Sequence, residues 1–301
     1  MTHHLSWLEA GVVGSMQGVA ELFPVSSLGH SVLLPAVIGG AWSRDLNVST
    51  PESPYLAFIV GLHVATAIAL VIYFWRDWLR VIGGLISSVA HREIRTSDQR
   101  LAWLLVLATI PVGLVGLFAE HWLRTNLAKP VPTAIFLIVN GLVLITAEQL
   151  RRRDPDLDSE YQDERLTGPE SDARLAALPA RRALLIGSAQ ILALAPGLSR
   201  SGVTMVAGML RGLSREDAAR FSFLLATPVI LAAGALKLGD LTGPLGSGIR
   251  GQVVFGSVLS GVGAYLSVRF LTRYLAGRSL RPFGAYCIVA GAASLAWFAV
   301  R

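Results

Sequence analysis

The sequence predicts an all-α polytopic membrane protein, with six transmembrane helices and two re-entrant helical hairpins arranged as an inverted repeat. Composition gives the first indication, because 53% of the 301 residues are hydrophobic and only 15% are charged. Ordinary soluble domains carry about 25% charged residues. The second indication is that long apolar runs recur along the chain. A chain of this kind has too few charges to cover a soluble surface, so its surplus apolar surface must face lipid.

Six apolar runs are long enough to cross a bilayer, which requires about 20 predominantly apolar residues. They cover residues 55–75, 101–119, 131–150, 218–238, 250–272 and 282–300. Pro111, Pro132 and Pro228 lie in or beside these runs. Proline is tolerated in membrane helices because neighbouring groups can bond the carbonyl that it frees. The six runs therefore predict six transmembrane helices.

Two further apolar regions, 5–41 and 183–212, are each interrupted by a polar segment. The first interruption is PVSSLGH at 24–30, and the second is PGLSRSG at 196–202. The apolar arms beside each interruption have roughly 10–18 residues, which is too short for two full spans. Irregular backbone at membrane depth is allowed only where protein or a water-filled cavity surrounds it. Each region therefore predicts a re-entrant hairpin.

The predicted elements follow the same order twice, as one hairpin and then three spans. Within a single membrane domain of residues 1–301, the first repeat covers 1–150 and the second covers 183–301. The segment 151–182 between them is rich in Arg, Asp and Glu, which predicts a solvated cytoplasmic linker loop. Because the first repeat has three spans, the second repeat starts from the opposite side of the membrane, as inverted-repeat proteins do.

The distribution of basic residues predicts the orientation. Nineteen of the 26 Lys and Arg residues fall in the loops near 76–100, 151–182, 211–220 and 269–281. The positive-inside rule places these loops in the cytoplasm. The first hairpin then enters from outside and the second from inside, so that their tips meet within the membrane. The net charge of +6 is explained in this way, and no basic patch interleaved with aromatic residues indicates nucleic-acid binding.

The first hairpin carries a carboxylate, hydroxyls and an imidazole within a short distance. Gln17 and Glu21 are four residues apart, so they share one face of a helix. Ser26, Ser27 and His30 follow. An ionisable residue at membrane depth is costly, and this favours a functional site over a structural cap or ion pair at Glu21.

His63, with Thr66 on the same face of the first span, allows two interpretations. Its side chain either lines the cavity or donates a hydrogen bond between helices. The sequence favours neither.

The second hairpin carries a predicted binding site for phosphate. Arg200 offers a planar fork of donors that suits phosphate oxygens. The neighbouring hydroxyls and a glycine add further donors, and a helix N-terminus favours negative charge. These residues are Gly197, Ser199, Ser201 and Thr204. The alternative, a helix cap with a snorkelling arginine, is disfavoured because a re-entrant tip lies far from either interface.

Together the two hairpins predict chemistry on a phosphorylated lipid. A carboxylate repels a phosphate unless a cation lies between them, so Glu21 is expected to bind a divalent cation, Mg²⁺ or Ca²⁺. The main alternative is a transporter or flippase for a phosphorylated polyprenyl lipid, since broken helices in inverted repeats also suit alternating access. A pure transporter releases no phosphate, and this distinguishes the two.

The two interrupted regions resemble the undecaprenyl-pyrophosphate phosphatase family, the integral-membrane type linked to bacitracin resistance. The segment QGVAELFPVSSLGH at 17–30 is similar to the first motif of the family, and PGLSRSGVT at 196–204 to the second. FSFLLATP at 221–228 is also similar. The order of spans and hairpins agrees over nearly the whole chain.

The resemblance implies removal of the terminal phosphate of undecaprenyl pyrophosphate. The product is the monophosphate carrier lipid, which is reused for peptidoglycan and other wall polymers. The resemblance also implies metal-dependent catalysis and a location in the bacterial cytoplasmic (inner) membrane. It further implies an active site that opens toward the outer, periplasmic side, and a possible homodimer.

The resemblance also implies a role for each site residue. Ser27 is the candidate nucleophile, and His30 is its base or, alternatively, the nucleophile itself. Gln17 and Glu21 would bind the metal or the pyrophosphate. Residues expected to contact the phosphates are Ser26, Gly197, Ser199, Arg200, Ser201 and Thr204.

Overall fold

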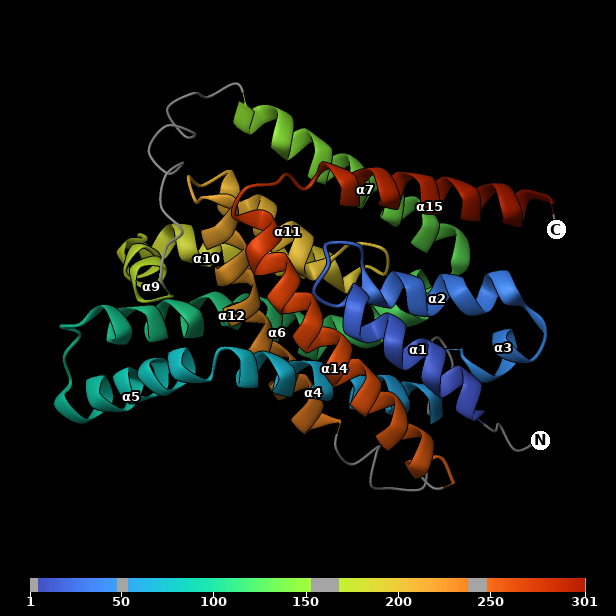
Figure 1. Ribbon diagram of the computed structural model, residues 1–301, viewed down its shortest axis with the longest axis horizontal. Coiled ribbons are helices and arrows are strands. Elements are labelled where there is room, and N and C mark those ends of the chain that lie inside the picture. Colours follow the sequence, from blue (N-terminus) through green and yellow to red (C-terminus); the bar gives the residue numbers. More distant parts are fainter. Residues whose placement is uncertain (1–4, 48–53, 153–167, 238–247, 301) are drawn as a thin grey trace.

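The computed structural model describes residues 5–47, 54–152, 168–237 and 248–300, and these residues form helices and no strands (Figure 1). The helices are α1 (Trp7–Ala20), α2 (Ser27–Ile38), α3 (Gly40–Asp45), α4 (Pro54–Tyr73), α5 (Trp75–His91), α6 (Ser97–Leu127), α7 (Pro130–Arg152), α9 (Gly168–Ala177), α10 (Ala180–Ser188), the 3₁₀ helix η1 (Ala189–Leu194), α11 (Arg200–Met209), α12 (Arg215–Leu236), α14 (Arg250–Leu275) and α15 (Arg281–Val300).

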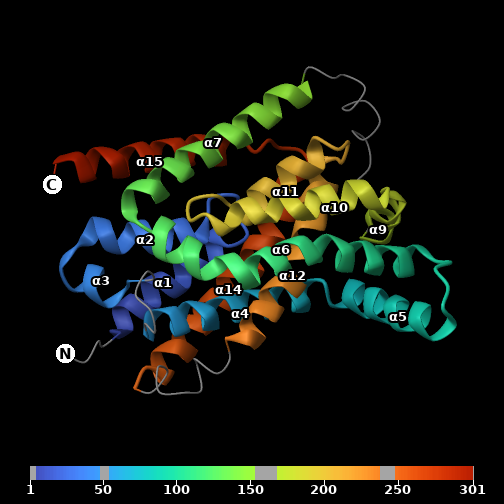
Figure 2. The same ribbon diagram turned by 180° about the vertical axis from the view of Figure 1, so that it is seen from behind.

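Six of these helices are long and apolar enough to cross a membrane. They are α4, α6, α7, α12, α14 and α15. Each coincides with one predicted span to within a few residues at its ends, except that α6 continues to Leu127, beyond the predicted end at residue 119. The prediction of a polytopic all-α membrane protein is therefore confirmed. The start of α1 and the end of α15 lie at the same end of the molecule in both views (Figures 1 and 2).

The first hairpin is formed by α1 and α2, which run side by side in opposite directions (Figure 1). A capping box begins α1, in which the side chain of Ser6 accepts from the backbone of Glu9 and the Glu9 carboxylate accepts from the backbone of Ser6. The chain turns through residues 21–26, three residues earlier than the start predicted at residue 24. Ser26 has a positive φ of 67° and caps α2 through a bond from Gly29 N to its Oγ of 3.1 Å.

The second hairpin is formed by α10, η1 and α11, and it enters from the opposite end of the molecule (Figure 2). Its irregular segment covers residues 195–199, so Arg200 is already the first residue of α11. Gly197 has a φ of 107°, and a Cβ there would collide with the carbonyl oxygen of Thr133, so only glycine fits. Ser199 caps α11 by accepting from Gly202 N at 3.2 Å.

The hairpins thus enter from opposite ends and their irregular segments meet between the spans, as an inverted repeat requires. Gly197 N donates to Ser26 Oγ at 3.2 Å, which joins the two irregular segments directly. Close helix packing supports this region, because Gly14 and Gly18 of α1 leave no room for a Cβ against the backbone of α14. Exact inversion of one repeat onto the other stays a prediction.

The segment 76–100 is mainly helical and not a loop as predicted, because helix α5 occupies most of it. Its cytoplasmic location stays a prediction. Along α5, apolar side chains recur at spacings of four and three residues and are exposed: Trp75, Leu79, Ile82, Ile86 and Val89. Charged residues such as Arg76 and Arg80 interrupt this stripe in the sequence and conceal its helical period.

The prediction that 151–182 is a solvated loop is also wrong for its described part, which contains helix α9. Asp172 of α9 is buried and accepts from Arg80 at 2.6 Å and from Arg220 at 2.8 Å. Asp217 of α12 accepts from Ser171 and Arg174 of α9. These bonds fasten α9 to α5 and α12. A bend of 102° separates α9 from the α10–η1 segment. Residues 153–167 of the predicted loop lie outside the described residues.

Candidate active site

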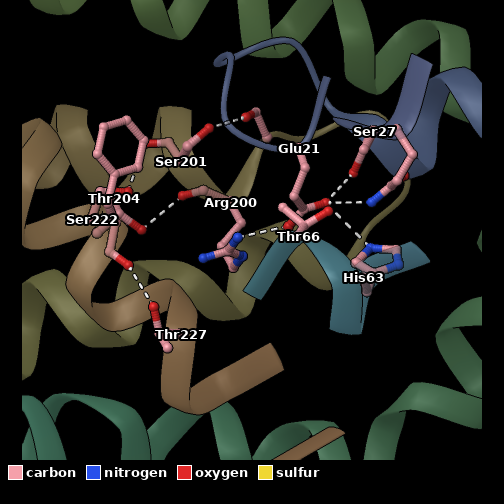
Figure 3. Close-up of polar contacts among 12 residues, drawn as sticks. Glu21, Ser27, His63, Thr66, Arg200, Ser201, Thr204, Ser222 and Thr227 are labelled. Carbon is pink, nitrogen blue, oxygen red and sulfur yellow. Dashed lines mark hydrogen bonds and ion pairs between the residues drawn. The ribbon is translucent and has the colours of Figure 1, made fainter. Parts of the chain in front are cut away.

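Glu21 is the centre of a polar cluster built from both hairpins (Figure 3). Its side chain is only 5% exposed. Its Oε1 accepts from Arg200 Nη2 at 2.6 Å, and its Oε2 accepts from Ser27 Oγ at 2.6 Å and from Gln17 Nε2 at 3.0 Å. The structure therefore brings together four of the residues that the sequence singled out, across 179 positions of sequence between Glu21 and Arg200.

Local structure explains how Glu21 reaches these partners. It follows directly after the last residue of α1, keeps helical dihedral angles and donates its backbone N–H to Gln17 O at 3.0 Å. The spacing of four residues therefore places Gln17 and Glu21 on one face, as predicted. Ser27 is the first residue of α2, so its hydroxyl faces back across the turn toward the carboxylate.

His63 of α4 belongs to the same cluster. Its Nε2 lies 3.2 Å from Glu21 Oε2, and its Nδ1 lies 2.9 Å from the carbonyl oxygen of Ile59. Both ring nitrogens thus face oxygen acceptors, an arrangement that a doubly protonated ring satisfies. With 27% of its side chain exposed, against 14% for Arg200, His63 is the more accessible of these two partners of Glu21.

Both interpretations that the sequence left open describe His63, because its contact with Glu21 belongs to the cluster and also joins α4 to the end of α1. Thr66 makes a further contact between helices, since its Oγ1 lies 3.1 Å from Ser260 Oγ of α14.

Two buried atoms of the cluster have no hydrogen-bond partner within the described part of the chain. They are Nη1 of Arg200 and Oε1 of Gln17. A buried polar atom without a partner costs roughly 1–3 kcal/mol. A phosphate oxygen would satisfy Arg200 Nη1, and a cation would satisfy Gln17 Oε1. The cluster is therefore incomplete in a way that suits a phosphorylated ligand.

These residues can bind a divalent cation only if phosphate oxygens of the substrate supply further ligands. No group of three or more His, Cys, Asp or Glu side chains that could hold a metal occurs among the described residues. One carboxylate and one orphaned amide oxygen are nevertheless adjacent, at Glu21 and Gln17. Mg²⁺ is commonly bound by one or two carboxylates together with phosphate oxygens and water. The residues present fit that mode of binding.

The hydroxyls of the second hairpin bond to backbone rather than to the Arg200 side chain. Ser201 Oγ donates to Phe23 O at 3.2 Å and lies 3.0 Å from Ser199 Oγ. Thr204 Oγ1 donates to the backbone oxygen of Arg200 at 2.7 Å (Figure 3). Ser201 therefore joins the two hairpins, whereas the bond of Thr204 stays within α11. The predicted contact of these hydroxyls with phosphate stays a prediction.

His30 points away from the Glu21 cluster. Its Nδ1 lies 2.7 Å from Ser26 O, and its Nε2 lies 2.7 Å from the hydroxyl of Tyr286 in α15. The two rings are nearly parallel, at 6°, with centroids 5.7 Å apart. Ser27 donates to Glu21 and not to His30. The base that this geometry offers to the serine is therefore the carboxylate.

Sequence reasoning missed two residues that the structure places at the hairpins. Tyr286 lies near the start of the last span, where an aromatic residue is ordinarily an interfacial anchor. Asn140 lies in the middle of a span and bonds to backbone of both hairpins. An amide in the middle of the apolar run 131–150 was the available signal for Asn140. Nothing in the sequence indicated that Tyr286 contacts His30.

The fold and the cluster define a polytopic membrane protein with a buried site for a phosphorylated group, formed where two re-entrant hairpins meet. The chain belongs to the family of the bacitracin resistance protein BacA, whose family model matches residues 10–293. The family resemblance found in the sequence is thereby confirmed.

Relatives of this chain are named as phosphatases. The undecaprenyl-diphosphatase of Mycolicibacterium paratuberculosis is 62% identical over 100% of both chains. Undecaprenyl-diphosphatase 1 of Frankia casuarinae is 49% identical, with 98% of this chain and 99% of the relative covered. Undecaprenyl-diphosphatase 2 of Burkholderia orbicola is 41% identical over 94% of each.

Proposed function

We propose that this chain is an undecaprenyl-diphosphatase. It hydrolyses undecaprenyl pyrophosphate to undecaprenyl phosphate and inorganic phosphate, and so recycles the carrier lipid for cell-wall synthesis. The observation that carries the proposal is the hydrogen-bonded series Ser27–Glu21–Arg200 inside the membrane domain. It joins the proposed nucleophile, the proposed base and the proposed phosphate-binding residue. The names of the full-length relatives support the same substrate.

Ser27 acts as the nucleophile in this proposal. Its Oγ attacks the terminal phosphorus while its proton passes to Glu21 Oε2, 2.6 Å away. The bond between that phosphorus and the bridging oxygen breaks, and undecaprenyl phosphate leaves with the bridging oxygen. Water then attacks the phosphoserine, which releases inorganic phosphate and restores the hydroxyl.

Arg200 binds and stabilises the transferring phosphoryl group. A guanidinium has five N–H donors, so Arg200 can keep its bond to Glu21 through Nη2 while the unpartnered Nη1 takes a phosphate oxygen. Phosphoryl transfer depends almost entirely on positioning and on neutralisation of charge. Donors preorganised in a site that excludes water supply the largest part of that stabilisation.

A divalent cation, Mg²⁺ or Ca²⁺, completes the proposed site. Glu21 and the Oε1 atom of Gln17 would hold it, and it would supply positive charge to the pyrophosphate oxygens. This arrangement gives the orphaned amide oxygen a partner. It also removes the repulsion between the Glu21 carboxylate and the incoming phosphates.

The proposed setting is the bacterial cytoplasmic (inner) membrane, with the site open toward the outer, periplasmic side. The distribution of basic residues supports this orientation, because the segments near 76–100, 151–182, 211–220 and 269–281 then lie in the cytoplasm. The pyrophosphate enters the cluster while the prenyl tail stays in lipid. A homodimer is also part of the proposal, by resemblance to the family, and the molar mass of the protein in detergent micelles would test it.

The experiment that tests the function is release of inorganic phosphate from undecaprenyl pyrophosphate by the purified protein in detergent. Release that requires a divalent cation and stops on addition of EDTA is expected. Well-folded protein that releases no phosphate with any divalent cation would instead indicate a transporter or flippase for the phosphorylated lipid.

A further inference from the structure

Asn140 lies in the middle of α7, inside a membrane span, and only 1% of its surface is exposed. A polar amide in that position is costly unless both its donor and its acceptor are bonded. Nδ2 of Asn140 donates to Pro24 O at 2.9 Å, and its Oδ1 accepts from Ser199 N at 3.0 Å. One side chain therefore bonds to the irregular backbone of both hairpins.

Both backbone groups are of the kind that a broken membrane helix leaves without a partner. Pro24 lies in the turn between α1 and α2, so its carbonyl has no place in either helix. Ser199 precedes α11, and an N–H at a helix N-terminus has no partner within the helix. Lipid offers no water to such groups. Asn140, on the separate helix α7, gives Pro24 O a donor and Ser199 N an acceptor. The only other contact to Pro24 O among the described residues is a weak one from Cys287 Sγ at 3.8 Å.

The chemistry of the amide is specific to this task. An amide has a donor and an acceptor on one carbon. Leucine is similar in shape but offers neither, and aspartate offers only the acceptor. The hydrogen bonds to Pro24 and Ser199 together need both.

The two bonds fix catalytic groups on either side. Pro24 stands three residues before Ser27, and Ser199 stands immediately before Arg200. The amide therefore sets the distance between the nucleophile with its carboxylate and the guanidinium. We propose that Asn140 is a positioning residue, which holds Arg200 in register with Ser27 and Glu21. This inference rests on the proposed phosphatase function.

A double-mutant cycle tests this positioning role. In otherwise wild-type protein, Asn140→Leu should lower kcat for phosphate release about 100-fold, the scale expected for a misplacement of about 1 Å. KM should change less than about threefold, because the substrate tail still binds. Arg200→Lys protein has no guanidinium left to align. In that background Asn140→Leu should lower the residual rate less than about threefold.

Matched controls separate positioning from folding. Cys287→Ala removes a thiol that makes only weak contacts, with Asn140 Nδ2 at 3.4 Å and with Pro24 O at 3.8 Å. It should therefore leave the rate near that of wild type. Size exclusion and thermal unfolding in detergent show whether each variant folds. If Asn140→Leu does not fold, Asn140→Asp takes its place in the cycle, because aspartate keeps the shape and the acceptor for Ser199 N.

The outcomes are distinct. If Asn140→Leu lowers kcat by the same factor in wild type and in Arg200→Lys protein, the positioning role would be overturned. Equal factors would mean that Asn140 acts independently of Arg200. An unchanged kcat for a folded Asn140→Leu protein would also overturn the positioning role. If the wild-type protein itself releases no phosphate, the proposed function fails rather than this inference.

Discussion

Glu21 of the first hairpin and Arg200 of the second are joined by a bond of 2.6 Å between Oε1 and Nη2. Neither residue could be held inside a membrane domain alone at reasonable cost. Their contact makes one site from two halves of the chain. The pairing also means that Arg200, the proposed phosphate-binding residue, and Glu21, the proposed base, orient each other before any substrate binds.

Ser27→Ala should lower phosphate release by at least about 10³-fold, as the loss of a nucleophile does in other hydrolases. Without the hydroxyl no phosphoserine forms, although Arg200 can still bind the pyrophosphate. The measurement is the initial rate of phosphate release at saturating substrate. Ser31→Ala is the matched control, because Ser31 lies one turn further along α2 and its buried Oγ has no hydrogen-bond partner among the residues that the structure describes. Near-normal turnover by Ser27→Ala would rule out the serine as nucleophile.

His63→Leu should lower kcat roughly 10- to 100-fold, because Glu21 Oε2 loses its contact with His63 Nε2. His63→Gln can still donate a hydrogen bond to the carboxylate, so it should recover part of the rate. His91→Gln, at the exposed end of α5, is the control. Equal losses in the Leu and Gln variants would show that the bond to Glu21 does not matter.

Tyr286→Phe tests whether Tyr286 acts through His30. The phenol donates to or accepts from His30 Nε2 at 2.7 Å, and this bond fixes the ring. Because His30 points away from the Glu21 cluster, Tyr286→Phe should lower kcat by less than about twofold. Tyr265→Phe, in α14, is the control for loss of a tyrosine hydroxyl. A tenfold loss in wild type that disappears in a His30→Gln background would contradict this and would give His30 a part in the reaction.

Gln17→Glu tests the proposed cation. A second carboxylate beside Glu21 adds an anionic oxygen ligand, so the Mg²⁺ concentration for half-maximal activity should fall about tenfold. Titration of EDTA-treated protein with Mg²⁺ measures this value. An unchanged or higher half-maximal concentration would argue against a cation at residues 17 and 21.

The sequence predicted the spans because bilayer thickness sets a length of about 20 apolar residues, and each run is visible without any knowledge of contacts. It also predicted both hairpins, because Pro24 and Pro196 interrupt apolar arms too short to cross. The irregular segments of the hairpins begin and end a few residues earlier than predicted. Ser26 and Ser199 turned out to be N-caps, so that Ser27, His30 and Arg200 belong to helices.

The contacts that complete the site could not be read from the sequence. Tyr286 and His30 are 256 positions apart, and Asn140 and Pro24 are 116 apart. Only the packing of α15 and α7 on the hairpins brings them together. Helix α9 was missed because its charged residues resemble those of a loop. They are instead used in ion pairs such as Asp172 with Arg220.

The most direct test of a single site built from both hairpins is a rate comparison of Glu21→Ala, Arg200→Ala and the double variant. Phosphate release from undecaprenyl pyrophosphate is measured for all three against wild type. Each single variant should lose on the order of 10²–10³-fold, and the double variant should be no slower than the worse single variant, because either change disables the same unit. A double variant whose loss equals the product of the two single losses would contradict the account, since the two residues would then act independently.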